Sequence, residues 1–99
     1  MQYDNRAVSI TIRKLRKKRG ISQEVLSGFA GIARTHLTMI ENGTKQPNLE
    51  TLWRIAQAFN IPASELIRLI EEEIETTSQQ YLSSTTKKNP DPRIGVLLF

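Results

Sequence analysis

The feature that most constrains the fold is the segment from Ser22 to Gly43, in which small and apolar residues stand at fixed positions. Counted from Gln23, the fifth residue is the small Ser27, and the ninth is Gly31, which can adopt the positive φ of a tight turn. The fourth, eighth, tenth, fifteenth and eighteenth residues are the apolar Leu26, Ala30, Ile32, Leu37 and Ile40. Two short helices can cross steeply around such a turn only when these positions are small or apolar. The spacing therefore predicts two packed helices, the second from about residue 33 to residue 41.

The outer face of that second helix distinguishes the segment from an ordinary helical hairpin of a small bundle. A bundle hairpin also shows apolar spacing and a glycine turn, but it does not need a small fifth residue or an outer face with a single cation at its start. The outer face here consists of Arg34, Thr35, Thr38 and Met39. Arginine can pair with guanine, and the methyl groups of threonine and methionine can meet a thymine methyl. The segment thus favours a helix that reads the major groove of double-stranded DNA.

Helical spacing extends on both sides of this segment. Val8, Ile12 and Leu15 recur on one face of a predicted helix over residues 6–19, which Asp4 or Asn5 can cap and Gly20 can end. Asn48 can cap a fourth helix, which ends at Asn60. The fold class predicted is all-α, with five short helices and no necessary sheet.

A fifth helix after Pro62 carries more apolar surface than one core face needs, which indicates deep burial or an interface. From Thr76 to Pro92 the sequence is rich in Ser, Thr, Gln, Lys, Asn and Pro, a composition that cannot bury enough surface to fold alone. We therefore predict a DNA-binding domain over residues 1–75 and a polar C-terminal tail over residues 76–99. A fifth helix prolonged to Tyr81 and Leu82 is the alternative.

Positive charge is concentrated in the first part of the chain. Residues 1–45 contain nine basic and three acidic side chains, whereas residues 46–75 contain two basic and six acidic ones. This distribution indicates an N-terminal half that faces a polyanion and a C-terminal half that is kept away from it. The run of cations over residues 13–19 can also be read as a solvated helix face.

Composition excludes several classes of protein. The 99 residues suffice for one domain, and the absence of cysteine removes disulfides, thiolate metal sites and thiol catalysis. No apolar run approaches the ~20 residues that span a bilayer. The single histidine, His36, has no second ligand at metal-binding spacing, and no nucleophile, base and oxyanion donors occur together. We expect a cytoplasmic, non-enzymatic protein without a metal or cofactor.

Three stretches resemble the Xre family of helix-turn-helix regulators, the group typified by lambda repressor and Cro. They are IRKLRKKRGISQ, ARTHLTMIENG and KQPNLETLWRIAQAFNIPASEL, and the resemblance runs from about Val8 to Leu69. It implies a five-helix, lambda-repressor-like DNA-binding domain that is usually a homodimer on a palindromic operator. The chain departs from the family pattern at Ala33, where a Ser or Thr cap is usual. It departs again at Gly28, at Phe29 where a polar residue is more common, and after Thr76.

Carried over position by position, the resemblance implies a set of DNA contacts at the second and third helices. The residues implied are Gln23, Arg34, Thr35, Thr38, Met39, Asn42, Thr44 and Lys45. The first five would touch bases or phosphates, and the last three look like phosphate clamps that fix the register. Further phosphate contacts are expected from Arg16, Lys17 and His36.

The function expected is a transcriptional regulator, a repressor that acts as a homodimer through the fifth helix and the C-terminal region. A phage or plasmid repressor, a restriction-modification controller and an antitoxin look alike at this level. An adaptor that uses the same fold to hold a protein partner is the alternative from another class. The apolar segment RIGVLLF at residues 93–99 is the feature in its favour, because it could add a strand to a partner.

Overall fold

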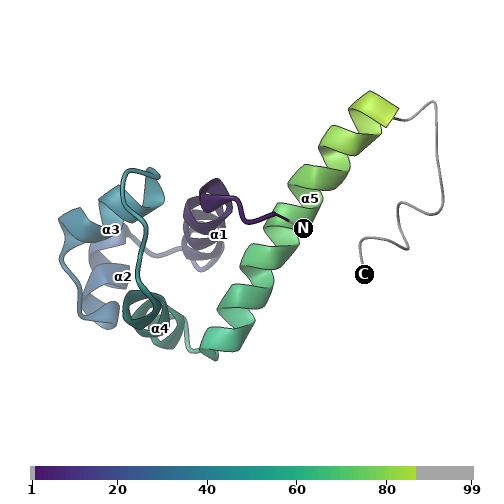
Figure 1. Cartoon of the computed structure of the whole chain (residues 1–99). Coiled ribbons are helices and arrows are strands. Elements are labelled where there is room, and N and C mark those ends of the chain that lie inside the picture. Colours follow the sequence, from purple (N-terminus) through teal and green to yellow (C-terminus); the bar gives the residue numbers. More distant parts are fainter. Residues whose placement is uncertain (1, 87–99) are drawn as a thin grey trace.

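The computed structural model describes the backbone of residues 2–86 and the side chains of residues 2–77 (Figure 1). The described part is all helical, which confirms the predicted fold class. In chain order the helices are α1 (Asn5–Lys18), α2 (Gln23–Ala30), α3 (Arg34–Glu41), α4 (Leu49–Ala58) and α5 (Ala63–Thr86). None of the described helices is both long and apolar enough to cross a membrane. The same residues bring together no group of His, Asp and Glu that could hold a metal ion.

Side chains cap three of the helices where the sequence predicted it. The carboxylate of Asp4 accepts a hydrogen bond from the Arg6 N–H at 3.0 Å, and the Ser22 hydroxyl accepts one from the Val25 N–H at 3.1 Å. Asn48 caps α4 in the same way, 2.8 Å from the Thr51 N–H. Because capping side chains satisfy backbone donors that a helix leaves unpaired, each helix begins at a defined residue.

All five helices contribute to one hydrophobic core. The largest fully buried side chains are Ile12, Leu26, Leu37, Ile40, Ile55, Phe59 and Leu66. In Figure 1, α2 and α3 form a lobe at one end, α4 lies below that lobe, and α5 packs against α1. This arrangement leaves the outer faces of α2 and α3 at the surface, on a framework held by the other helices.

The last helix is longer than the predicted domain boundary at residue 75 implied. It continues to Thr86, so residues 76–86 are helical, in agreement with the alternative of a helix prolonged past Tyr81 and Leu82. The composition argued against burial of these residues, but a helix can continue past its buried part where neither Gly nor Pro interrupts it. The first such residue after Ala63 is Pro90. The segment RIGVLLF lies outside the described residues.

Candidate DNA interface

The turn between α2 and α3 has the geometry that the spacing predicted. Gly31 adopts a φ of 70°, and the Ile32 N–H donates to the Ser27 carbonyl at 3.1 Å. Ser27 is buried where the two helices cross, so a larger side chain there would separate them. The two helices therefore hold a fixed relative orientation, which a DNA-reading helix requires.

The third helix begins without a side-chain cap. Ala33 occupies the cap position in an extended conformation, and its methyl group makes no hydrogen bond to the first turn. The amides of this turn are therefore free of a side-chain acceptor, beside the positive end of the helix dipole. Such a terminus favours contact with a phosphate group.

We predict that replacing Ala33 with serine raises the free energy of unfolding by about 1 kcal/mol, because the new hydroxyl can accept from the His36 N–H. Urea unfolding followed by circular dichroism measures the change. Ala33→Val, which offers no acceptor, is the matched control and should give no gain. An unchanged urea midpoint for the serine variant would show that this turn is already satisfied.

The predicted reading residues on α3 differ in exposure. Arg34, Thr35 and Met39 are exposed, while His36 and Thr38 are half-buried. Arg34 takes part in none of the ion pairs among the described residues, so its guanidinium is available to a ligand. The exposed part of this face thus combines one available cation with uncharged side chains.

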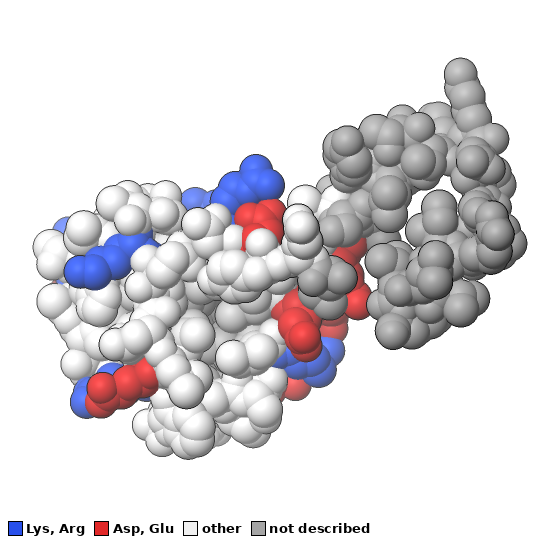
Figure 2. Space-filling model, in the orientation of Figure 1, with Lys and Arg blue, Asp and Glu red and all other residues white. Residues whose placement is uncertain are grey.

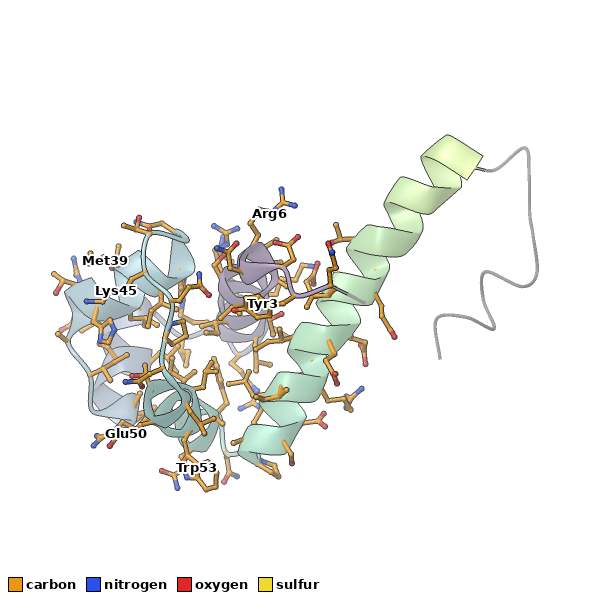
Figure 3. The ribbon with its side chains drawn as sticks, in the orientation of Figure 1. Tyr3, Arg6, Met39, Lys45, Glu50 and Trp53 are labelled. Carbon is orange, nitrogen blue, oxygen red and sulfur yellow. The ribbon has the colours of Figure 1, made fainter. Side chains whose placement is uncertain are left out.

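The predicted clamp residues follow α3 directly and are all exposed. Asn42 accepts a hydrogen bond from the Thr44 N–H at 2.8 Å, and the Lys45 N–H donates to the Met39 carbonyl at 3.1 Å. These bonds fold the loop back onto the end of the helix. Figure 3 shows Lys45 and Met39 close together on one side of the molecule.

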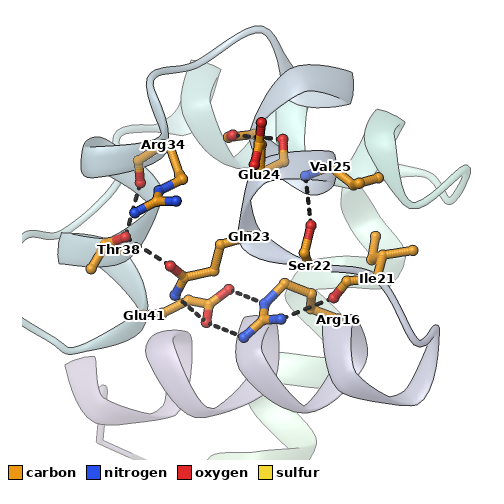
Figure 4. A network of polar contacts seen from close by, with 10 residues as sticks. Arg16, Ile21, Ser22, Gln23, Glu24, Val25, Arg34, Thr38 and Glu41 are labelled. Carbon is orange, nitrogen blue, oxygen red and sulfur yellow. Dashed lines mark hydrogen bonds and ion pairs between the residues drawn. The ribbon is translucent and has the colours of Figure 1, made fainter.

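A polar network behind α3 joins three helices (Figure 4). Arg16 of α1 forms a bidentate ion pair with Glu41 of α3, from Nε to Oε2 at 2.7 Å and from Nη2 to Oε1 at 3.0 Å. Its Nη1 also donates to the Ile21 carbonyl at 2.9 Å. The two side chains are only 13% and 3% exposed, so the pair is largely shielded from water. It therefore fixes α3 against α1.

This network corrects the expectation for Arg16. The sequence grouped it with Lys17 as a phosphate contact, but hydrogen bonds to Glu41 and to a carbonyl occupy its guanidinium. The hydrogen bonds that the guanidinium donates to Glu41 raise the pKa of Arg16 above its ordinary value, so the guanidinium remains charged. Arg16 supports the interface from behind, whereas Lys17 is exposed on the same helix.

Gln23 belongs to the same network. Its Nε2 donates to Glu41 Oε1 at 3.1 Å, and its Oε1 accepts from the Thr38 hydroxyl at 2.8 Å. Because a carboxylate only accepts hydrogen bonds, this arrangement fixes which way the amide points. One N–H of the amide is left over, so Gln23 can still donate to DNA. That contact stays a prediction.

Sequence reasoning did not identify Glu41. A signal was present, because Glu41 is one of three acids among residues 1–45 and stands at the C-terminal end of its helix, where the helix dipole disfavours a negative charge. An acid at so unfavourable a place indicates a specific cationic partner.

Acidic side chains gather along α5. Figure 2 shows most of the visible ones there, on the side of the molecule away from α3. Glu65 and Glu72 both pair with Arg68, and Glu73 pairs with Lys14 of α1 at 2.9 Å. The acidic half of the chain therefore concentrates its carboxylates on α5, although Lys14 of the basic half pairs with one of them.

Comparisons with known proteins agree with this geometry. Residues 12–66 match the helix-turn-helix family model HTH_3. The transcriptional regulator SutR of Escherichia coli is 37% identical over 62 residues, which are 63% of this chain and 35% of SutR. The CTXphi transcriptional repressor RstR of Vibrio cholerae is 33% identical over 67 residues, which are 68% of this chain and 60% of RstR. The chain thus spans between about a third and three fifths of these two relatives.

Solved structures show the same fold. The restriction-modification controller protein C.AhdI of Aeromonas hydrophila superposes with a TM-score of 0.61 at 30% identity, over 64% of this chain and 96% of that one. The clp gene regulator ClgR of Corynebacterium glutamicum reaches a TM-score of 0.70 over 92% of this chain and 100% of that one; at 17% identity it shows the fold alone. Together with the spacing and the exposed face of α3, these matches show that the chain belongs to the HTH_3 family of Xre-like, DNA-binding transcriptional regulators.

Proposed function

We propose that this protein is a sequence-specific repressor that binds a palindromic operator as a homodimer. The observation that carries the proposal is the exposed face of α3, which holds the available Arg34 and uncharged side chains and is fixed from behind by the Arg16–Glu41 ion pair. A helix held in this way can present the same side chains to every duplex, so it can discriminate among base sequences. The similar protein RstR is a transcriptional repressor, which supports the direction of regulation proposed here.

In the proposed complex, α3 lies in the major groove with Arg34 and Thr35 toward base edges, and Thr38 and Met39 one turn further along. Phosphates would be bound by the uncapped start of α3, by Gln23 and by the clamp residues Asn42, Thr44 and Lys45. The acidic side chains along α5 would keep that helix away from the phosphates.

A groove beside α5 supports the homodimer. It measures about 290 Å³, lies between the start of α1, α4 and α5, and is lined mainly by apolar side chains. They include Tyr3, Val8, Leu52, Ile67, Ile70 and Ile74. Ile67 is 39% exposed and Tyr3 is 69% exposed. Two half-sites of a palindrome lie about one DNA turn apart, so a twofold arrangement that covers this groove must place the two copies of α3 ~34 Å apart to bind one.

We expect Ile67→Glu to convert the protein from a dimer to a monomer in sedimentation equilibrium at submicromolar concentration, because it places a charge in the proposed interface. Ser64→Glu, an exposed substitution one turn earlier in α5, is the control and should leave the mass unchanged. If Ile67→Glu remains dimeric, the dimer forms through another face.

The decisive experiment selects bound duplexes from a random pool and then measures affinity for the selected and a scrambled duplex over a range of salt concentrations. A repressor should select a palindrome and bind it at least ~1,000-fold more tightly than the scramble. Equal affinities with a steep dependence on salt would leave only electrostatic attraction and would refute the proposal.

A further inference from the structure

A second apolar surface lies on α2 and α4, away from both the DNA interface and the groove beside α5. Phe29 of α2 is 69% exposed and Trp53 of α4 is 54% exposed. They border a groove of about 400 Å³ that is also lined by Gly31, Glu50 and Arg54. We call these five residues the aromatic face. Exposed aromatic side chains at a concave site typically mark a protein contact.

The aromatic face is separate from the surfaces already described. In Figure 3, Trp53 and Glu50 lie along the lower side of the molecule, whereas Met39 and Lys45 lie at the upper left. Phe29 makes no contact in the proposed DNA complex. An aromatic side chain is also unusual at this position, where the resemblance to the Xre family implies a polar residue. Its exposure is therefore unexplained by DNA binding.

The groove also has a polar border, formed by Glu50 and Arg54. Gly31 has a positive φ, and a Cβ atom there would come within 3.2 Å of the Arg54 guanidinium, so Arg54 lies directly over the turn. Arg54 also pairs with Glu50 at 3.2 Å, and the two side chains are 48% and 74% exposed. An exposed pair of this kind contributes little to stability and exchanges partners at low cost.

We propose that the aromatic face binds the aromatic face of a second copy of this chain across a twofold axis. A twofold contact needs a self-complementary surface. This face carries one acid and one base, so Arg54 of each copy can pair with Glu50 of the second copy, and each Trp53 can enter the other groove. The two charges balance, so the face has no net attraction for a polyanion such as DNA.

Self-association here adds a second contact to the one proposed beside α5. A subunit with two different twofold contacts does not stop at a dimer: it closes into a tetramer where the two axes intersect at a right angle, and it otherwise continues to add subunits. The mass of the protein should therefore increase beyond the dimer as its concentration rises. The Ile67→Glu variant, a monomer when dilute, should assemble in the micromolar range no further than a dimer joined through the aromatic faces.

Trp53 makes the test specific, because it is the only tryptophan in the chain. We expect its fluorescence to shift to the blue and to resist iodide quenching as the full chain is concentrated through the micromolar range, in step with the mass from sedimentation equilibrium. Phe29→Ser should abolish both changes, whereas the control Arg13→Ser, at an exposed position of α1, should preserve them.

Reversing the charges of Glu50 and Arg54 tests whether the aromatic face binds a second copy of the chain. Arg54→Glu and Glu50→Arg should each abolish the blue shift, because like charges would then face each other, and an equimolar mixture of the two variants should restore it. Trp53 fluorescence that is independent of concentration would overturn the proposal, and so would a mixture that fails to recover while both variants remain helical. If the aromatic face binds a different protein instead, Trp53 fluorescence of the purified chain should not depend on its concentration.

Discussion

Replacing Glu41 with alanine is expected to lower the free energy of unfolding by about 3–5 kcal/mol, because it leaves the Arg16 guanidinium buried without its counter-charge. The pair is bidentate, and its two side chains are 13% and 3% exposed, so the carboxylate acts where water is largely excluded. Glu41 also accepts from Gln23, whose amide would lose its fixed orientation. Urea unfolding followed by circular dichroism measures the loss.

Two further variants show whether burial is the cause. The double replacement of Arg16 with methionine and Glu41 with leucine removes both charges, so it should recover most of the lost stability. Lys14→Ala breaks the ion pair with Glu73, in which the lysine is 68% exposed, and should cost less than about 1 kcal/mol. Equal, small losses for Glu41→Ala and Lys14→Ala would contradict the interpretation that the first pair is shielded.

The order and ends of the helices could be predicted because the signals for them are local. Ser22 and Asn48 cap helices through amides three residues away, and Gly31 supplies its own positive φ. The apolar spacing of α2 and α3 likewise identified the residues at their crossing. Each of these features depends on a few neighbouring residues, so the sequence displays it directly.

The polar network could not be predicted from the sequence, because it joins residues that are far apart along the chain. Arg16 stands in a run of cations and looks like its neighbours, and its partner lies 25 residues further along the chain. Only the packing of α1 against α3 determines which cation in the run becomes buried. The predicted boundary at residue 75 came before the end of α5 because a polar composition indicates that residues are not buried. It does not indicate that they are not helical, since a helix backbone can continue without burial.

Arg34→Ala is expected to weaken binding to the selected operator by about 1–3 kcal/mol. It should weaken binding to a scrambled duplex much less, so the ratio of the two affinities falls. The guanidinium is exposed at the start of α3 and pairs with no acid among the described residues, so it can present two donors to the O6 and N7 of guanine. Fluorescence anisotropy with both duplexes, at several salt concentrations, measures the affinities.

Lys45→Ala is the matched control, since it removes one exposed cation from the loop that follows the same helix. A lysine that contacts a phosphate contributes equally on every sequence, so its loss should weaken both duplexes alike and reduce the salt slope by about 1. Arg34→Ala would behave in the same way if the arginine only bound a phosphate. In that event specificity would have to come from Thr35, Thr38 and Met39, whose contacts to bases depend on methyl groups rather than on paired donors.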